Sequence, residues 1–274
     1  MQGHKNEINC LVALADGCVL SGGKDTNLKL WDLTTARCRR TFEGHTHEVL
    51  CAAELNNGNL TSGALDKSII VWERKTGLIL NTLEGFEQPV ILVMELPDMR
   101  ISLSCGEKYI LVWEWQSELD DNLVAFEEHD GNVLDMCVMR ESILTASSDK
   151  SVRKWSIDEE TCEGTFNGHK GSVFKITQMD ANLFATAASD HVVKVWDFTT
   201  LECTRSLATH TSAISSVMFI EGEGLLVSTS LDGTIAVWSP YYGSQPLQRK
   251  INQEAPVKHA IYLGKMVLSL RDLA

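Results

Sequence analysis

Five segments of the chain carry the side chains of a nucleophilic triad, in one order and at nearly constant spacing. Each segment has a histidine, then a serine or threonine, and then an aspartate four residues after that hydroxyl. A histidine that deprotonates a hydroxyl while a carboxylate orients the ring is the arrangement of acyl-transfer enzymes. The hydroxyl and aspartate pairs are Ser21 with Asp25, Ser62 with Asp66, Thr145 with Asp149, Thr186 with Asp190 and Ser228 with Asp232.

The repetition of this set argues for a structural role and against catalysis. An enzyme needs the arrangement once, beside a group that stabilises the oxyanion, whereas this chain has it five times with Ser and Thr exchanged. Each aspartate also precedes a tryptophan by six residues. We therefore predict a structural role for these side chains inside each repeat, where an unpaired polar group would cost roughly 1–3 kcal/mol. The chain is predicted not to be an enzyme.

Tryptophans give the period of the sequence. They recur every 41 or 42 residues, and a histidine, or once Phe86, lies 26–28 residues before each of them. The tryptophans are Trp31, Trp72, Trp113, Trp155, Trp196 and Trp238, and the histidines are His4, His45, His129, His169 and His210. Short β-rich runs between turn residues, without a helical period, predict four strands per repeat, a to d from the centre outward. A lone four-stranded sheet exposes two apolar faces, so the repeats are expected to stack in a ring.

Gly-His and Trp-Asp pairs stand at fixed places in this period, as in Gly3-His4 with Trp31-Asp32 and Gly168-His169 with Trp196-Asp197. These signatures closely resemble those of the WD-repeat family, over residues 3 to about 250. The resemblance implies an all-β β-propeller and a hydrogen-bonded chain from Asp to His to Ser or Thr, into which the indole N–H donates. It implies one domain over residues 1–274, with repeats at about 3–43, 44–84, 85–127, 128–167, 168–208 and 209–251 and a partial repeat at 252–274.

The last of these repeats is incomplete. Residues 256–263 are predicted as strand a and residues 265–270 as strand b, and the chain stops at Ala274. We therefore expect a seven-bladed β-propeller with six complete blades and an incomplete seventh that has strands a and b only. Three explanations are open: a fragment, a shortened gene product, or outer strands supplied by another chain or segment. The open edge of blade 7 is expected to invite pairing.

The third repeat departs from the pattern. Phe86 takes the place of the histidine, Leu103 that of the hydroxyl and Glu107 that of the aspartate, so only Trp113 is kept. Apolar packing is expected to replace the polar chain, with contributions from Trp115, Ile101, Leu111 and Met94. Nine acidic residues against Lys108 alone lie between positions 107 and 135, and the connection over 116–122 is long. The blade is either a drifted repeat or a specialised contact blade.

Composition limits the partners. The 274 residues are 44% hydrophobic, as in a globular protein, and carry a net charge of −13. An acidic chain does not attract phosphate backbones or anionic lipid, so neither nucleic acid nor a membrane is expected as a partner. The chain has no apolar run of membrane-spanning length and no signal sequence at Met1. Basic proteins or peptides are the natural partners of such a surface.

The cysteines and remaining histidines predict neither disulfides nor a metal site. Cys38, Cys162 and Cys203 each follow a tryptophan by seven residues, so they are expected in separate blades as reduced thiols. Such thiols favour the cytoplasm or the nucleus. The other histidines, which lack metal-ligand spacing, are His47, His191 and His259. Residues 22–25 lack the following helix that a phosphate loop needs, so no cofactor is expected.

The resemblance also implies where a partner binds. WD-repeat propellers often hold peptides on the face of the d-to-a loops and b-to-c turns, with the third and fifth residues after the histidine and the residue before the aspartate. On this chain the predicted protein-binding residues are Glu7, Asn9, Lys24, Glu48, Leu50, Leu65, Pro89, Ile91, Asn132, Leu134, Ser172, Phe174 and Leu231. Carboxylates beside an apolar crescent suit a basic peptide with an apolar anchor, unless some apolar members only line the channel.

These observations favour a non-catalytic protein–protein interaction scaffold that binds a partner protein or peptide on this loop face. The alternative is a substrate-recognition module of a larger complex such as a ubiquitin ligase, because propellers of this family often follow an adaptor-binding domain. A hydrolase ranks third, since no catalytic constellation occurs only once.

Overall fold

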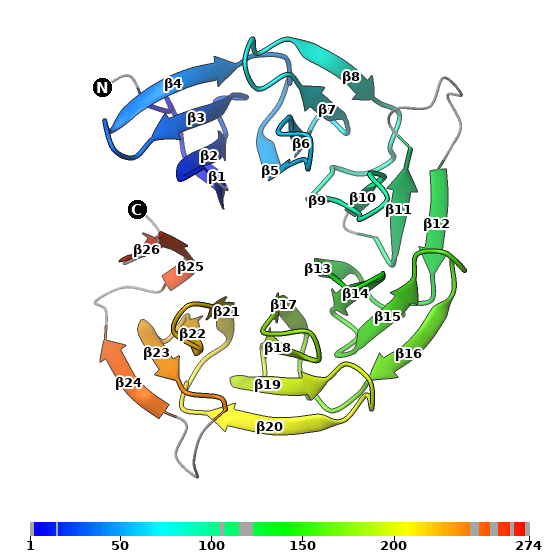
Figure 1. Cartoon of the computed structure of the whole chain (residues 1–274), viewed down its shortest axis with the longest axis vertical. Coiled ribbons are helices and arrows are strands. Elements are labelled where there is room, and N and C mark those ends of the chain that lie inside the picture. Colours follow the sequence, from blue (N-terminus) through cyan, green and yellow to red (C-terminus); the bar gives the residue numbers. More distant parts are fainter. Residues whose placement is uncertain are drawn as a thin grey trace. The chain divides into compact units, whose positions relative to one another are not determined.

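The computed structural model describes residues 3–14, 16–104, 107–114, 123–241, 247–252, 257–263 and 266–271. Their regular elements are β-strands (Figure 1). No helix in these ranges has the length and hydrophobicity needed to cross a bilayer. The chain forms two compact units, residues 1–127 and 128–274, which are described in turn.

The first unit contains three antiparallel sheets of four strands, each paired in sequence order. Blade 1 has β1 (Ile8–Ala13), β2 (Cys18–Gly23), β3 (Leu28–Asp32) and β4 (Arg37–Phe42). Blade 2 has β5 (Val49–Glu54), β6 (Leu60–Ala64), β7 (Ile69–Trp72) and β8 (Ile79–Leu83). Blade 3 has β9 (Leu92–Glu95), β10 (Ile101–Ser104), β11 (Tyr109–Trp113) and β12 (Leu123–Glu127).

The second unit repeats this plan three times and adds a hairpin. Blade 4 has β13 (Val133–Met139), β14 (Ser142–Ser147), β15 (Val152–Ser156) and β16 (Cys162–Phe166). Blade 5 has β17 (Val173–Gln178), β18 (Leu183–Ala188), β19 (Val192–Asp197) and β20 (Cys203–Ala208). Blade 6 has β21 (Ile214–Ile220), β22 (Leu225–Ser230), β23 (Thr234–Trp238) and β24 (Leu247–Asn252). The hairpin pairs β25 (Val257–Leu263) with β26 (Met266–Arg271).

The all-β β-propeller is confirmed, but the predicted seven-bladed β-propeller with an incomplete seventh blade is wrong. The structure has six blades of four strands. β25 and β26 form a two-stranded sheet beside β21 and β22. A hairpin without a third and fourth strand is not a blade, because a blade presents two broad faces for packing. Pairing of another strand at the open edge of this hairpin stays a prediction, as do the single-domain boundaries.

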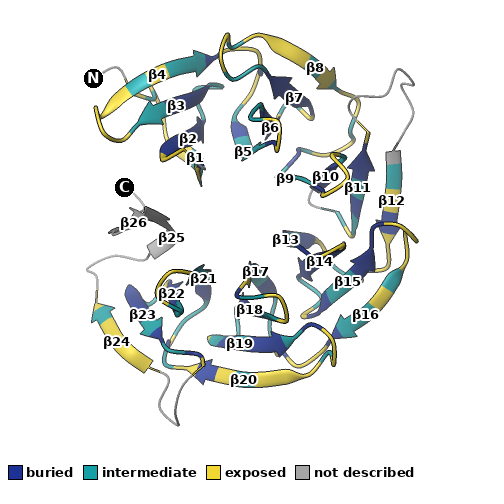
Figure 2. Ribbon diagram, in the orientation of Figure 1, coloured by how far each residue is buried: buried dark blue, intermediate teal, exposed yellow. Residues whose placement is uncertain are grey.

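Blades are held together by apolar faces that pack on the next blade of the same unit. In the first unit Leu20 and Phe42 of blade 1 share a buried cluster with Leu60 and Trp72 of blade 2. Each such side chain contributes about 1.5–3 kcal/mol when fully removed from water. The second strand of each blade is therefore almost entirely buried, while the residues of the fourth strands β4, β8, β16, β20 and β24 are mainly half-buried or exposed (Figure 2).

The cysteines that follow a tryptophan by seven residues occupy equivalent positions, as predicted. Cys38, Cys162 and Cys203 lie on the outer strands β4, β16 and β20. Each is the cross-strand partner of its tryptophan at a shift in register. Their thiols are free, and the Sγ atoms of Cys38 and Cys203 donate to backbone oxygens two residues on, at 3.3 and 3.2 Å.

Candidate protein-binding face

A hydrogen-bonded chain inside each blade fixes the loops that carry the face. In blade 2 the Ser62 hydroxyl lies 2.8 Å from His45 Nε2 and 2.8 Å from Trp72 Nε1. His45 Nδ1 lies 3.0 Å from a carboxylate oxygen of Asp66. A carboxylate only accepts, so Nδ1 carries the proton and Nε2 accepts from the serine, which in turn accepts from the indole. The hydroxyl is thus fully engaged and is not available as a nucleophile.

The predicted chain is confirmed in four other blades. The hydroxyls of Ser21, Thr145, Thr186 and Ser228 lie 2.6–2.7 Å from a histidine Nε2 and 2.7–2.9 Å from an indole nitrogen. Blade 6 differs at one link. His210 Nδ1 is 3.7 Å from the Asp232 carboxylate, and the Thr234 hydroxyl lies between them, 2.8 Å from the ring and 2.6 Å from Asp232.

Burial and hydrogen bonding set the charge states of the histidine and the aspartate in this hydrogen-bonded chain. Desolvation lowers the pKa of His45 below its ordinary value, so the ring stays neutral at pH 7. Burial by itself would raise the pKa of Asp66, but hydrogen bonds from the Ser68 hydroxyl, the Thr46 N–H and His45 hold it below its ordinary value. Asp66 therefore ties the loop before strand a to the turn between strands b and c. The same backbone contact is made in the other four blades by Lys5, Asp130, Lys170 and Thr211.

The turns between strands b and c share a strained conformation. The residue after the aspartate has a positive φ of 64° at Lys67, 75° at Lys150 and 68° at His191. Left-handed backbone is unfavourable for side chains other than glycine, and it persists where surrounding contacts determine it. The aspartate supplies such contacts, because it accepts from the N–H two residues on, as at Ser68 and Ser151.

The structure brings two of the three predicted position classes together in five of the blades. The N–H of the residue before the aspartate donates to the carbonyl of the third residue after the histidine. The five bonds join Lys24 to Glu7, Leu65 to Glu48, Ser148 to Asn132, Ser189 to Ser172 and Leu231 to Ala213, at 2.8–3.0 Å. Gly106, the corresponding residue of blade 3, lies outside the described residues. Backbone polar groups at the face are thus satisfied, and the side chains remain for contacts.

The third class of predicted positions is the fifth residue after the histidine. These residues lie at β-bulges, which the sequence did not reveal. The pairing of β1 with β2 passes from Ile8 to Cys10, so Asn9 is the extra residue. Leu50, Leu134, Phe174 and Ser215 are skipped in the same way in β5, β13, β17 and β21. Bulges redirect a side chain and are frequent next to functional sites. Ile91 of blade 3 precedes β9, whose pairing with β10 shows no shift.

Polar members of the predicted site contact one another in the first unit. Lys24 Nζ lies 2.5 Å from Glu7, whose side chain is 62% exposed. Asn9 Nδ2 lies 3.3 Å from the Glu48 carboxylate and 3.1 Å from the Val49 carbonyl oxygen. The predicted carboxylates are therefore held in place by neighbours from the same blade or the next.

Apolar members are only partly covered. Leu65 in the first unit is 40% exposed and Leu231 in the second is 43% exposed, at equivalent turn positions. The other apolar members are half-buried: Leu50, Pro89 and Ile91 in the first unit, and Leu134 and Phe174 in the second. Asn132 is exposed and Ser172 is half-buried. The assignment of these residues to a binding site stays a prediction.

Blade 3 has an apolar interior, as its sequence predicts. Leu103 and Trp113 are buried in one cluster, and Phe86 packs against it. Ile101 and Leu111 also belong to this cluster, whereas Trp115 and residues 116–122 lie outside the described residues. Whether the blade is a drifted repeat or a contact blade stays a prediction.

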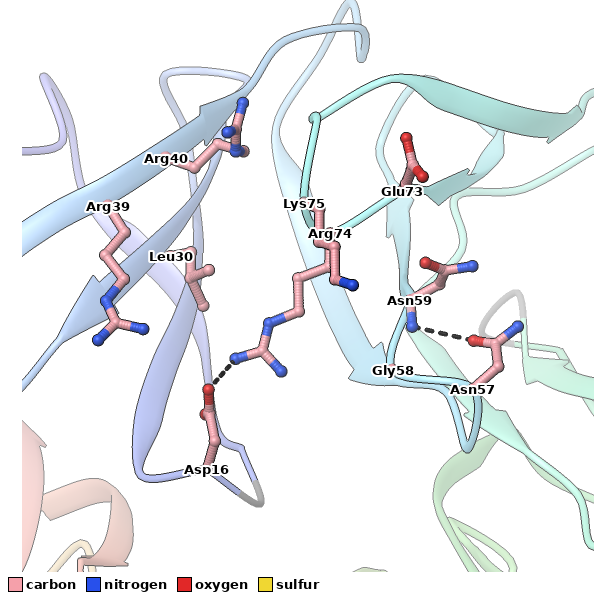
Figure 3. A pocket seen from close by; sticks show the side chains of 10 residues that line it. All are labelled: Asp16, Leu30, Arg39, Arg40, Asn57, Gly58, Asn59, Glu73, Arg74 and Lys75. Carbon is pink, nitrogen blue, oxygen red and sulfur yellow. Dashed lines mark hydrogen bonds and ion pairs between the residues drawn. The ribbon is translucent and has the colours of Figure 1, made fainter.

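Sequence reasoning missed a pocket of about 580 Å³ between the turns of blades 1 and 2 (Figure 3). Arg74 reaches across it and bonds Asp16 of blade 1 and Glu54 of blade 2, each at 2.6 Å. The hydrogen bond from Arg74 lowers the pKa of Asp16 to about 2. Arg74 thus forms an ion pair with one carboxylate from each blade and links blade 1 to blade 2 across the pocket.

The comparisons with known proteins agree with this geometry. The family model "WD domain, G-beta repeat" matches residues 1–32, 36–73, 160–197 and 201–239, more than half of the chain. The chain belongs to the WD-repeat family. WD-repeat propellers are generally non-catalytic and typically bind proteins or peptides. The matched residues leave out positions 74–159, which hold blade 3 and most of blade 4.

Individual relatives match parts of the WD-repeat array. Probable coatomer subunit beta′ of Schizosaccharomyces pombe is 29% identical over 119 residues, which are 41% of this chain and 15% of that protein. Cilia- and flagella-associated protein 52 of Homo sapiens is 32% identical over 106 residues, 37% of this chain and 17% of that protein. The chain thus spans less than a fifth of these two relatives. The WD40 β-propeller domain of Doa1 superimposes with a TM-score of 0.79 at 22% identity, covering 98% of this chain and 91% of that one, which shows the fold.

Proposed function

We propose that this WD-repeat propeller is a non-catalytic scaffold that binds a partner protein or peptide on the face of its d-to-a loops and b-to-c turns. The observation that supports this most is the recurrence of a β-bulge at the fifth position after the histidine. Asn9, Leu50, Leu134 and Phe174 are all bulge residues with half-buried side chains. A bulge redirects its side chain, and residues near loops on a rigid scaffold often form binding surfaces.

The chemistry of the face favours a basic partner with an apolar anchor. Leu65 and Leu231 offer apolar area that is 40% and 43% exposed, and burial of such area drives most protein association. Glu7 is 62% exposed, and only Lys24 neutralises it. A lysine or arginine of the partner would compete with Lys24 for this carboxylate, and the net charge of −13 would steer it there.

We propose the cytoplasm or the nucleus as the location, from the spacing of the cysteines. The recognition arm of a larger assembly, such as a ubiquitin ligase, is the alternative role. It is favoured by the relatives, in which the matched segments are only 15% and 17% of the whole protein.

A selection from a random peptide library tests the scaffold role. We expect the immobilised chain to enrich peptides that combine an apolar residue with lysine or arginine, and calorimetry to give a saturable affinity for them. The double variant Leu50→Ala, Phe174→Ala removes one apolar side chain of the proposed face from each unit. It should weaken that affinity at least about tenfold, because truncating an anchoring apolar contact costs more than about 1 kcal/mol.

Met99→Ala is the matched control, since Met99 is 52% exposed and lies in a turn between strands a and b. It should bind like the wild type, and all variants should keep the wild-type melting temperature. The proposed face is refuted if the double variant and the Met99 variant bind equally well. The absence of any enriched peptide would count against a peptide-binding scaffold altogether.

A further inference from the structure

The outer strand of blade 3 is a regular sheet edge. β12 (Leu123–Glu127) is the last strand of its sheet (Figure 1). Its five residues pair with β11 in one unbroken register, from Trp113 opposite Leu123 to Tyr109 opposite Glu127. An edge strand directs the N–H and C=O groups of alternate residues away from its sheet. The rim of blade 3 therefore offers an uninterrupted row of hydrogen-bonding groups to a further strand.

The outer strands of the other five blades are interrupted by β-bulges. In each of them the pairing with the third strand shifts by one residue next to the tryptophan. The extra residues are Arg39 in β4, Leu80 in β8, Glu163 in β16, Thr204 in β20 and Gln248 in β24. A bulge leaves one residue unpaired and bends the strand, which keeps an edge from pairing further. Among the outer strands that the structure describes, only β12 lacks this protection.

The side chains of β12 leave its edge accessible. Phe126 is buried and Val124 is half-buried, whereas Ala125 and Glu127 are exposed. Because neighbouring residues of a strand point to opposite faces, the exposed face of β12 has a methyl group at its centre and a carboxylate at its end. A charge at the centre of an edge strand would oppose strand addition, but the single charge of β12 is on its last residue. The middle of the strand is thus unprotected.

The charge around this edge selects the kind of strand that fits it. Glu127 is exposed and forms no ion pair with any described residue. In the sequence Glu118, Asp120 and Asp121 precede the strand, and Glu128 follows it. A second copy of β12 would bring acidic ends together in either orientation, and like charges opposite each other are unfavourable. A strand with basic ends is matched instead.

We propose that β12 is a strand-addition site, at which an extended segment of a partner protein pairs with the edge of blade 3. The segment is apolar at its centre and has lysine or arginine at its ends. Backbone hydrogen bonds hold it, while a basic residue opposite Glu127 and the open space over Ala125 select its sequence. Blade 3, which lacks the polar chain, is then a specialised contact blade.

The length of β12 limits the strength of this contact. One strand of five residues buries less than the roughly 1,200–2,000 Å² of a stable interface. We therefore expect dissociation constants of about 10 μM to 1 mM for an isolated segment. The site uses no residue of the proposed binding face, so it goes beyond the proposed function and the two can fail separately.

Backbone-methylated peptides test whether strand pairing occurs. The probe is a capped peptide of alternating valine and threonine with lysine at each end, titrated into the full chain by calorimetry. Three N-methyl groups on alternate residues leave one edge of this peptide free, and it should bind about as well as the unmethylated probe. Three N-methyl groups on consecutive residues block both edges and should weaken binding at least about fivefold. Equal affinities of the two methylated peptides, or no binding of the probe up to millimolar concentration, would overturn the proposal.

Charge placed on the edge tests its location. Ala125→Lys should weaken the unmethylated probe at least about fivefold, because a lysine at the centre of the edge opposes strand addition and repels the basic ends. Leu247→Lys is the matched control on the outer strand β24, where Leu247 is 38% exposed, and it should bind like the wild type. The double variant Leu50→Ala, Phe174→Ala should also bind like the wild type. Equal effects of the two lysine variants, or loss of binding in the double variant, would place the peptide elsewhere and refute the site.

A charge exchange tests the kind of occupant. Glu127→Lys should weaken the lysine-ended probe about 2- to 30-fold, because a favourable cross-strand pair becomes an unfavourable one. The same variant should bind a glutamate-ended peptide better than the wild type does, which also shows that it is folded. If Glu127→Lys still prefers the lysine-ended probe, the basic segment is the wrong occupant. Self-association of the wild-type chain that Ala125→Lys abolishes would likewise replace the partner segment by a second copy.

Discussion

In blade 2 the tryptophan donates to a serine, whereas in blade 3 the equivalent tryptophan packs against leucine and phenylalanine. Ser62, bonded to His45 and Trp72, occupies the place that Leu103 fills in blade 3. Both side chains are completely buried. A polar interior is stable only when every donor and acceptor has a partner, while an apolar interior needs only volume that fits.

The comparison shows what the polar chain contributes. Blade 3 has four strands although it lacks the polar hydrogen-bonded chain. That hydrogen-bonded chain is therefore not required for the sheet itself. In blade 2, however, Asp66 joins two loops through Thr46 and Ser68, and blade 3 has Glu107 at that position. The polar chain therefore acts on the loops more than on the strands.

The largest effect is expected when the blade 2 residue is placed in blade 3. Leu103→Ser removes apolar volume and buries a hydroxyl that has no histidine to accept its proton, which together should lower the free energy of unfolding by about 3–6 kcal/mol. Chemical denaturation would measure this. The triple variant Phe86→His, Leu103→Ser, Glu107→Asp supplies partners for the hydroxyl and should recover part of the loss. No recovery would mean that the blade 3 backbone cannot hold the polar chain.

A smaller loss is expected from removal of the carboxylate in blade 2. Asp66→Ala leaves His45 Nδ1, the Thr46 N–H and the Ser68 N–H without their acceptor, at a cost of about 2–4 kcal/mol. Glu107→Ala is the matched control in blade 3 and should change stability by less than about 0.5 kcal/mol. Thermal unfolding of the two variants gives the comparison. An unchanged melting curve for Asp66→Ala would contradict the structural role of the chain.

The smallest effect per residue is expected from pH. Burial lowers the pKa of His45, His129, His169 and His210 below the ordinary 6.5. The unfolded histidines take up protons near pH 6.5 while the folded ones remain neutral, so the free energy of unfolding falls as the pH drops below about 6.5. A second decline is expected below about pH 4, because the buried aspartates have lowered pKa values.

Calorimetry from pH 8 to pH 3 measures this profile. Blade 3 has Phe86 in place of the histidine, so it adds no network histidine to the decline between pH 6.5 and pH 5. Replacing a network histidine in another blade, as in His45→Gln, should flatten that decline. A melting temperature that does not vary between pH 7.5 and pH 5 would show that the buried rings do not resist protonation.

The recurrence at fixed spacing identified the members of the polar chain in five repeats, and the resemblance to the WD-repeat family predicted the order in which they bond. The same regularity predicted the apolar exception at Leu103. The blade count was wrong because strands a and b were taken as evidence of a blade, whereas the two-stranded sheet of β25 and β26 has no outer strands. Strand patterns predict pairs, but a blade also needs the third and fourth partner.

Other parts of the candidate site follow from pairing geometry that no residue pattern carries. The bulge at Asn9 depends on how Ile8 and Cys10 pair with β2, and nothing in residue type marks it. The contact of Arg74 with Asp16 joins residues 58 positions apart, outside the period of the repeat. By contrast, the predicted face positions came from the resemblance to the WD-repeat family, and their role in binding stays a prediction.

The short reach of the hydrogen-bonded chain bears on how the protein folds. In blade 2 the bonded residues are separated by only 21, 17 and 10 positions along the sequence. Closing such small loops costs little entropy, and contacts of low sequence separation form quickly. A blade can therefore assemble its interior while it emerges from the ribosome. The apolar face that it leaves exposed is covered only after synthesis of the next repeat, so within each unit blades are expected to form in order from the N-terminus.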